Sequence, residues 1–388
     1  MKSRLAAATR VHVLDTTMLY SPGGGGVVRY LLAKRRWLRH NTRVRHSLLV
    51  PGERNGMGLH GETFIHCREV PGLRSRVPLD TRAWSRAIAE REPDVVEIGD
   101  PGPIALAAFR ARRNAGMPVI AFCHTDLERD AHARYGRVAA RTMKSYARRV
   151  FERADRVLTP SEYMRRRLTD WGVRDVIVCP LGVDADLFHP AQRDTALRRL
   201  LGLPPGARLC VYAGRFAPAK NIPVLVDAFR LLGRPYHLLM IGSGARVPPL
   251  PANVTVLPFE RDPSRLAALV GGADAFVQAG ERESFGLAVV EAMACGVPVV
   301  AVADGAAPEI VTPDCGLLVR AGSAPHLAAG VAALYGADRE RMGAAARTRA
   351  ERHFGWDRVF HRLLQHYASV VHGSAAREIG RASCRERV

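Results

Sequence analysis

The sequence predicts an α/β protein with two doubly wound domains that face a cleft. Short apolar runs typical of buried parallel strands alternate with segments of helical spacing. This alternation occurs in two successive series, which meet in a Pro-bounded stretch at 180–190. With 388 residues, of which 47% are hydrophobic, the chain is long enough and apolar enough for two ordinary globular domains.

The first series opens with a strand over 10–15, a glycine run at 23–26 and a helix that starts near Val27. A glycine loop between a strand and a helix lets the backbone approach a phosphate closely. A run of four glycines taken alone is more often just a flexible loop. Its position directly after the first strand favours a binding role for Gly24, Gly25 and Gly26.

Two further strands are expected over 94–98 and 118–123, with a helix from Ile104 between them. His124 follows the second of these strands. A single histidine is more often a structural residue than a catalytic one, but ligand contacts concentrate at the carboxyl ends of parallel strands. His124 is therefore a candidate site residue.

A basic amphipathic helix is predicted over 138–153, and Ser161 is expected to cap the helix that follows the strand beginning near Asp155. The crossing at 180–190 contains Asp184-x-Asp186, a spacing that elsewhere binds metal–nucleotide complexes. Because prolines bound this loop, we interpret the pair as turn chemistry and predict no metal site.

The second series begins with a strand over 208–213, followed by Arg215 and Lys220. An arginine and a lysine at a strand end can neutralise the charge of a leaving diphosphate without a metal. A strand over 237–241 then leads into Gly242-Ser-Gly244. The third glycine of a dinucleotide fingerprint would fall at Val247, which disfavours NAD binding. Later elements are expected at 254–257, 261–269, 316–319, 324–334, 337–353 and 356–371.

The stretch from Asp274 to Val302 is the most informative part of the second series. It predicts a strand over 274–278, a loop, a helix over 286–294 that ends at Gly296, and another strand. Glu283 precedes the helix and Glu291 lies within it, only ~7.5 Å along the axis. The helix N-terminus favours an anion, so two carboxylates beside it predict a pocket for a sugar joined to a phosphate. An isolated glutamate pair is usually only a solvated surface feature.

The sequence around this pair resembles retaining glycosyltransferases of family four, which have the GT-B fold of two Rossmann-like domains. The matching pattern is Glu-x7-Glu with Phe-Gly-Leu inside, followed by Ala-Met-Ala-x-Gly-x-Pro-Val-Val. The glycine loop, Gly214-Arg with Lys220, and the 180–190 crossing are similar to the same family. The resemblance covers about residues 10–371. It implies an acceptor domain over 1–187, a nucleotide-sugar domain over 188–354 and a closing helix over 355–372. We interpret 373–388 as a disordered tail, outside the fold.

The resemblance also implies roles for residues. The catalytic set would be His124, Arg215, Lys220 and Glu283, with Glu283 on the transferred sugar and His124 at the donor sugar or acceptor. Glu291 would hold the nucleotide ribose. The remaining donor-binding residues would be Gly24, Gly25, Gly26, Gly242, Ser284, Phe285, Gly286 and Leu287, besides Arg215 and Lys220. No cofactor is expected beyond a UDP- or GDP-linked sugar as donor substrate, and the acceptor would be a lipid or glycan hydroxyl.

Three positions depart from the family pattern, and the last two, which adjoin the expected base and sugar sites, leave the donor open. Asn221 replaces a common glycine, Glu260-Arg261 replaces a glycine-bearing loop, and Gln278-Ala-Gly replaces a Pro-Ser type run. Two other functions also stay open: a nucleotide-sugar epimerase of the same architecture, and a catalytically silent sugar-nucleotide-binding protein.

The chain carries a formal net charge of +20, and the excess is larger in its first half. This charge suggests an anionic membrane surface as a partner, through two basic clusters on separate helices: Lys34, Arg35, Arg36 and Arg39 on one, and Arg141, Lys144, Arg148 and Arg149 on the other. A composition rich in arginine explains the charge nearly as well. No nucleic-acid-binding motif is present. Without a signal peptide, and with cysteines that lack metal-ligand spacing, the protein is expected to be cytoplasmic, with peripheral contact to the inner face of the membrane.

Overall fold

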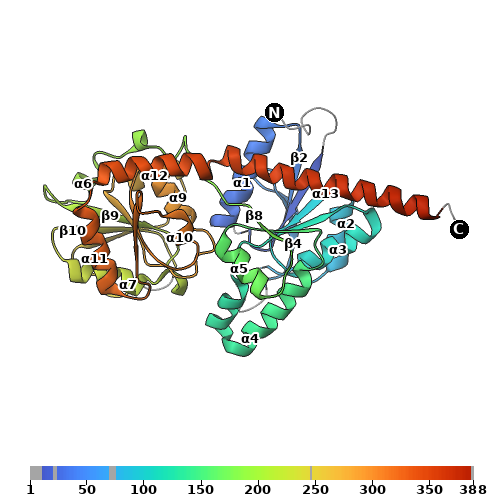
Figure 1. The fold of residues 1–388 in the computed structure, drawn as a ribbon, viewed down its shortest axis with the longest axis horizontal. Coiled ribbons are helices and arrows are strands. Elements are labelled where there is room, and N and C mark those ends of the chain that lie inside the picture. Colours follow the sequence, from blue (N-terminus) through green and yellow to red (C-terminus); the bar gives the residue numbers. More distant parts are fainter. Residues whose placement is uncertain (1–10, 21–23, 70–75, 245–246, 386–388) are drawn as a thin grey trace. The chain divides into compact units, whose positions relative to one another are not determined.

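The structure is a computed structural model that describes residues 11–20, 24–69, 76–244 and 247–385. It divides into two compact units, Met1–Cys179 with Val359–Val388, and Pro180–Arg358 (Figure 1). We describe each unit by itself. Both are doubly wound α/β folds, which confirms the predicted fold class.

Within its described residues, unit 1 contains an eight-stranded sheet of order β3-β4-β2-β1-β5-β6-β7-β8. Every pair is parallel except β3 with β4. The strand order reverses at β1, which pairs with β2 on one side and β5 on the other. Loops that leave the carboxyl ends there form the crevice where doubly wound folds bind ligands. The strands are β1 (His12–Thr16), β2 (Arg45–Gly52), β3 (Gly56–Met57), β4 (Thr63–His66), β5 (Val95–Ile98), β6 (Val119–Phe122), β7 (Arg156–Thr159) and β8 (Val176–Val178).

The helices of unit 1 begin at residues suited to capping. The Asp80 side chain accepts hydrogen bonds from two backbone N–H groups of α2, Pro103 occupies the first turn of α3, and Ser161 caps α5 as predicted. The helices are α1 (Gly26–Asn41), α2 (Thr81–Ala89), α3 (Pro103–Ala115), α4 (Leu127–Phe151), α5 (Glu162–Asp170) and most of α13 (Trp356–Arg385).

The prediction for α4 was too short. The helix begins at Leu127, where Asp126 accepts a hydrogen bond from the Arg129 N–H, and Glu128 and Asp130 in its first turn suit the helix dipole. It is interrupted at Gly136, whose φ of 83° and ψ of −173° are almost restricted to glycine. The predicted segment from 138 is only the part after this break.

Unit 2 contains a parallel sheet of order β11-β10-β9-β12-β13-β14 within its described residues. The order reverses at β9, so the loops after β9 and β12 flank the crevice. Its strands are β9 (Arg208–Ala213), β10 (Tyr236–Ile241), β11 (Val254–Leu257), β12 (Ala275–Gln278), β13 (Val299–Val302) and β14 (Gly316–Val319). Its helices are η2 (Pro190–Gln192), α6 (Leu197–Leu200), η3 (Pro218–Lys220), α7 (Ile222–Leu232), α8 (Pro263–Gly271), α9 (Leu287–Ala294), α10 (Ala307–Ile310), α11 (Ala324–Tyr335) and α12 (Arg339–Phe354).

The two units divide at Cys179/Pro180, whereas the sequence placed the boundary at 187/188. The crossing segment belongs to unit 2 because its backbone pairs there. The Val183 N–H donates to the Phe354 carbonyl at 2.7 Å, and the Arg347 guanidinium donates to the Ala185 and Phe188 carbonyls. Asp184 accepts the Leu187 N–H at 3.1 Å, which confirms that it forms a turn.

The closing helix is longer than predicted. α13 continues to Arg385, so the segment from 373 is helical and not a disordered tail. Alanine, arginine and glutamate residues in this segment have high helix propensity, which outweighs the lack of an apolar period. Residues 386–388 lie outside the described residues.

Candidate active site

The loops after β9 and β10 are held together by backbone hydrogen bonds. The Gly214 N–H donates to the Ile241 carbonyl at 3.0 Å, and the Phe216 N–H donates to the Ser243 carbonyl at 2.8 Å. A Cβ on Gly242 would collide with the Gly214 carbonyl oxygen. Gly242 thus allows the close approach of these loops, and Arg215 lies exposed between Gly214 and Phe216.

Lys220 and Glu283 form an ion pair between the loop after β9 and the loop after β12. Their side chains are 25% and 12% exposed. Two further contacts fix these loops: the Glu281 N–H donates to the Ala219 carbonyl at 3.0 Å, and the Asn221 amide donates to the Glu281 carboxylate at 2.8 Å. Asn221 takes a φ of 47°, a left-handed conformation that asparagine tolerates, so it replaces the family's glycine without losing the turn.

The N-terminus of α9 begins beside this ion pair in the sequence. Gly286 is the N-cap residue, with a φ of 101°, and no side chain caps the helix. The first turn has no acidic residue, so its partial positive charge is not neutralised by a carboxylate of that turn. Phe285 is buried and packs edge-on against Phe354, with ring centroids 5.6 Å apart. The predicted helix start at 286 shifts by one residue, and Gly296 ends the helix with a φ of 72° as expected.

Glu291 is only 5% exposed on α9. The sequence predicted that Glu283 and Glu291 flank one spot. The structure joins Glu283 to Lys220, and it buries Glu291 on the helix that follows. Ser284 and Leu287 are partly buried on the same loop and first turn. Arg215, Lys220, Gly242 and residues 283–287 thus follow the carboxyl ends of β9, β10 and β12, and Glu291 lies within α9.

In unit 1, the glycine loop leads into α1. Gly24 and Gly25 have φ values of 89° and 134°, and Gly25 is the N-cap, without any side chain that caps the helix. Gly26 begins α1. Gly23 lies outside the described residues. Two successive left-handed residues explain why glycines are needed here.

Asp100, which sequence reasoning missed, organises the neighbouring loop. Its carboxylate accepts hydrogen bonds from the Thr17 hydroxyl at 2.8 Å and from the Met18 N–H at 2.6 Å. Burial raises the pKa of this carboxyl group. Its position at the carboxyl end of a strand was the only sequence signal that could have indicated it.

His124 lies directly after β6 and is 4% exposed. Its ring stacks on Phe122, with centroids 4.3 Å apart, and lies 5.2 Å from the Tyr30 ring. Burial lowers its pKa to about 3, and Lys34 adds to this effect. Its Nδ1 atom is buried and has no hydrogen-bond partner among the described residues. The imidazole is therefore neutral at neutral pH and cannot supply a positive charge.

Unit 1 also contains a buried network of charged side chains around Lys34. This network corrects the prediction that Lys34 belongs to a membrane-facing cluster. Lys34 is fully buried, with its Nζ 2.7 Å from Asp15 and 3.1 Å from Glu97, so it cannot belong to a membrane-facing cluster. The Tyr30 and Tyr367 hydroxyls donate to Glu97 at 3.1 and 2.5 Å. Burial alone would raise the pKa of Asp15, but Lys34 and His46 lower it, whereas burial keeps the pKa of Glu97 raised.

Two family descriptions match the chain: "Glycosyl transferases group 1" over residues 194–349 and "Glycosyltransferase Family 4" over residues 24–187. A GDP-mannose-dependent alpha-mannosyltransferase from Mycobacterium tuberculosis (strain CDC 1551) is 30% identical over 347 residues, which cover 86% of this chain and 90% of the relative. The chain belongs to glycosyltransferase family 4. This membership confirms the resemblance and makes the protein an enzyme, a hexosyltransferase.

A second relative of this glycosyltransferase, from Mycobacterium tuberculosis (strain H37Ra), is 29% identical over 335 residues, which cover 82% of the chain and 86% of the relative. It is named a GDP-mannose-dependent alpha-(1-6)-phosphatidylinositol dimannoside mannosyltransferase. Among solved structures, a sucrose-phosphate synthase from Thermosynechococcus elongatus has a TM-score of 0.78 at 21% identity and covers 94% of this chain and 100% of its own. The glycosyltransferase therefore has the GT-B fold. No helix in the described part of the chain is long and apolar enough to cross a membrane.

Proposed function

We propose that this glycosyltransferase transfers mannose from GDP-mannose to a hydroxyl of a lipid or glycan, with retention of the anomeric configuration. Two mannosyltransferase relatives named for GDP-mannose support the donor. The observation that carries the chemistry is the Lys220–Glu283 ion pair at the carboxyl end of the unit 2 sheet. It joins a cation suited to a diphosphate with a carboxylate suited to sugar hydroxyls.

In the proposed reaction the bond between the sugar C1 and the diphosphate oxygen breaks, and the acceptor oxygen bonds to C1 on the same face. The departing phosphate takes the acceptor's proton. Lys220 and the exposed Arg215 neutralise the charge that gathers on the leaving diphosphate, and the uncapped N-terminus of α9 adds its partial charge. In this scheme the two cationic side chains and the helix N-terminus stabilise the leaving diphosphate, so no metal ion is required.

Glu283 accepts hydrogen bonds from hydroxyl groups of the sugar, and its ion pair with Lys220 orients it. Glu291 holds the ribose. The neutral His124 ring positions the donor sugar or acceptor and is not a proton source. In unit 1, the glycine loop at Gly24–Gly26 can offer backbone N–H groups to phosphate oxygens.

The acceptor is proposed to be lipid-linked because one relative is named for a phosphatidylinositol dimannoside. A peripheral position at an anionic membrane would suit such a substrate. The exposed Arg141, Arg148 and Arg149 of α4 can contribute to it, whereas Lys34 cannot. Co-sedimentation with vesicles that contain or lack anionic lipid, over a salt series, tests this membrane association. Binding that does not depend on lipid charge would contradict it and would favour a soluble acceptor.

The deciding experiment incubates the purified enzyme with GDP-mannose, UDP-glucose, UDP-galactose and GDP-glucose, each with and without a mannosylated lipid acceptor. We expect free GDP and a mannosylated product only when GDP-mannose and the acceptor are both present. Conversion of the donor to an epimer without any acceptor would instead establish the epimerase. Release of nucleotide only from UDP-sugars would overturn the proposed donor while leaving the transferase activity.

A further inference from the structure

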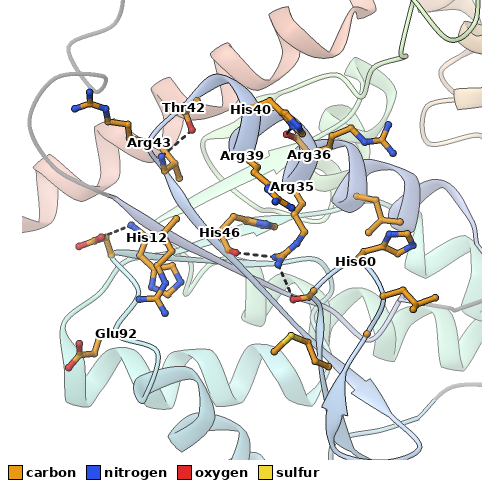
Figure 2. A pocket seen from close by; sticks show the side chains of 18 residues that line it. His12, Arg35, Arg36, Arg39, His40, Thr42, Arg43, His46, His60 and Glu92 are labelled. Carbon is orange, nitrogen blue, oxygen red and sulfur yellow. Dashed lines mark hydrogen bonds between the residues drawn. The ribbon is translucent and has the colours of Figure 1, made fainter.

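A large cavity opens at the amino-terminal edge of the unit 1 sheet, where β1 and β2 begin (Figure 2). Its volume is about 1470 Å³, ample for a phosphorylated small molecule. It is lined by the C-terminal half of α1, the first residues of β1 and β2, and the hairpin that joins β3 to β4. The glycine loop and His124 follow the carboxyl ends of strands, so this cavity lies at the opposite edge of the sheet.

The lining is strongly cationic. Two acidic residues, Glu92 and Asp94, line the cavity, and Asp94 already accepts the His12 backbone N–H at 2.6 Å. The cations outnumber them. Five arginines contribute to the wall: Arg35, Arg36, Arg39, Arg43 and Arg45.

The hydrogen bonds that cap the C-terminus of α1 do not involve these arginines. The carbonyl of Leu38 accepts hydrogen bonds from the Thr42 backbone N–H and hydroxyl, and the Asn41 amide donates to the Trp37 carbonyl. Complementing the helix dipole explains a basic last turn. It does not explain Arg43 and Arg45, which lie beyond the helix on the same cavity wall.

Arg35 gives the cavity a fixed floor. Its guanidinium donates to the His46 carbonyl at 3.0 Å and to the Gly61 carbonyl at 2.9 Å (Figure 2). Gly61 has a φ of 78°, and a Cβ there would lie 2.5 Å from the guanidinium. The hairpin thus needs a glycine in order to close over Arg35, which is partly desolvated as a result.

Two buried histidines on the wall have unsatisfied ring nitrogens. The Nδ1 atoms of His12 and His46 have no hydrogen-bond partner among the described residues. The His46 Nε2 lies 2.9 Å from Asp15, a carboxylate that requires a donor, so Nδ1 of the neutral ring carries a lone pair. Both Nδ1 atoms are themselves buried, so the histidines shape the wall, and phosphate oxygens would accept hydrogen bonds from the arginines.

We propose that this cavity is a second binding site, separate from the donor site, for a ligand that carries phosphate groups. Arg39 and Arg45 attract and bind the phosphate oxygens, and Arg35 shapes the floor. Arginine forks recognise phosphate bidentately, which makes phosphate a better match than a carboxylate of similar charge.

The phosphate has two candidate sources. Met57 and Leu59 of the β3–β4 hairpin line the cavity and are 80% and 100% exposed. Large apolar side chains beside a cationic cavity suit the headgroup of a phospholipid. A free phosphorylated metabolite would use the cavity without them.

The test measures binding of inorganic pyrophosphate by calorimetry, with saturating GDP present to occupy the donor site. A parallel arm measures co-sedimentation with phosphatidylcholine vesicles that contain or lack phosphatidylglycerol. The site variant is Arg39→Gln/Arg45→Gln. The matched control, Arg341→Gln/Arg352→Gln, removes the same charge from exposed positions on α12 of unit 2. Circular dichroism checks the fold of both variants.

We expect the site variant to raise the pyrophosphate Kd by about tenfold or more, since charge-assisted hydrogen bonds are each worth about 1.5–3 kcal/mol. The control should bind like the natural chain. Vesicle binding that only the site variant loses would also support the site and would assign it to a lipid headgroup. Failure to bind either probe, or equal losses in both variants, would overturn the proposal. The assay with the four nucleotide sugars does not depend on any of these outcomes. Failure of the phosphate site is therefore distinguishable from failure of the proposed transferase function.

Discussion

Single side chains account for the proposed donor chemistry, and Lys220 is the clearest of them. Only four lysines occur in the chain, and the structure places two of them in ion pairs with opposite consequences. Lys220 is a quarter exposed beside Glu283, whereas Lys34 is fully buried between Asp15 and Glu97. Exposure leaves Lys220 able to meet a diphosphate; burial confines Lys34 to holding the fold.

Replacing Lys220 or Arg215 by alanine should slow transfer without unfolding the protein. Loss of one contact to a developing charge costs about 3 kcal/mol in the transition state, which corresponds to about 100-fold in kcat. Steady-state kinetics with GDP-mannose provide the measurement, and Arg341→Ala on exposed α12 is the control. Near-normal kcat in both variants, with unchanged thermal stability, would remove these residues from the diphosphate site.

Glu283→Gln and Glu291→Gln should have different effects. Glu283 is proposed to contact the moving sugar, so its variant should lower kcat and leave GDP affinity almost unchanged. Glu291 is proposed to hold the ribose, which binds similarly in ground and transition states, so its variant should chiefly weaken GDP binding. Calorimetry with GDP and steady-state kinetics separate the two effects. The opposite pattern would exchange their roles.

His124 predicts a dependence of stability on pH. Its pKa is lowered to about 3 in the folded protein by burial, against an ordinary value of 6.5. Between these values the unfolded chain binds a proton that the folded chain does not, so stability falls as the pH drops through this window. From about pH 7 to about pH 5 this one group should cost about 2 kcal/mol.

Urea unfolding of the natural chain and of His124→Gln at both pH values measures this effect. The variant should lose less stability on acidification than the natural chain does. His12, His46, His237 and His366 have pKa values lowered in the same direction, so part of the acid sensitivity remains in the variant. Equal losses in both proteins would mean that His124 is already protonated when folded, or is exposed.

Secondary-structure elements are joined in unit 1 by the buried network around Lys34. β1 supplies Asp15, β5 supplies Glu97, α1 supplies Lys34 and Tyr30, and α13 supplies Tyr367. Segments that are far apart in the sequence thus share one set of hydrogen bonds. Such a network specifies how the elements pack, and it penalises the loss of any one partner.

Lys34→Met should therefore destabilise unit 1 by about 3–5 kcal/mol, because it leaves buried carboxylates without their cation. Arg36→Met on the same helix is exposed and should change stability by no more than about 0.5 kcal/mol. Chemical denaturation followed by circular dichroism provides the comparison. If the two variants lose similar stability, the network does not hold these elements together.

The whole molecule consists of two units, and ligands should stabilise them unequally. The proposed GDP contacts lie mainly in unit 2, at the loops after β9, β10 and β12. Binding to the folded state alone stabilises it by about 2.7 kcal/mol at a ligand concentration 100 times the Kd. Hydrogen exchange should therefore slow far more in β9, β10 and β12 than in β2 and β7 of unit 1.

Mass spectrometry of peptides after exchange, with and without GDP, can test this expectation. Uridine diphosphate at the same concentration is the control for base selectivity. Protection confined to unit 1 would show that GDP binds unit 1, and it would contradict the proposed site in unit 2. Equal protection by the two nucleotides would contradict the proposed preference for GDP.

The sequence by itself determined the fold class and the strand-end positions of the residues proposed for the donor site. Apolar runs located β9 and β14 within their observed bounds, and the order of strand, loop and helix placed Arg215, Lys220 and Glu283 at strand ends. These features are local: strand burial, glycine conformations and helix ends depend on neighbouring residues. The resemblance to the family then suggested the roles of these residues, which remain to be tested.

Only the tertiary structure decided which charges are buried and which elements belong together. Nothing in the sequence near Lys34 distinguishes it from the arginines that follow, yet it lies in the core while Arg36 and Arg39 lie on a cavity wall. The crossing segment joined unit 2 through backbone pairing with residues more than a hundred positions away, including Val183 with Phe354. Such pairings depend on contacts between distant segments, which periodicity and local propensity do not encode.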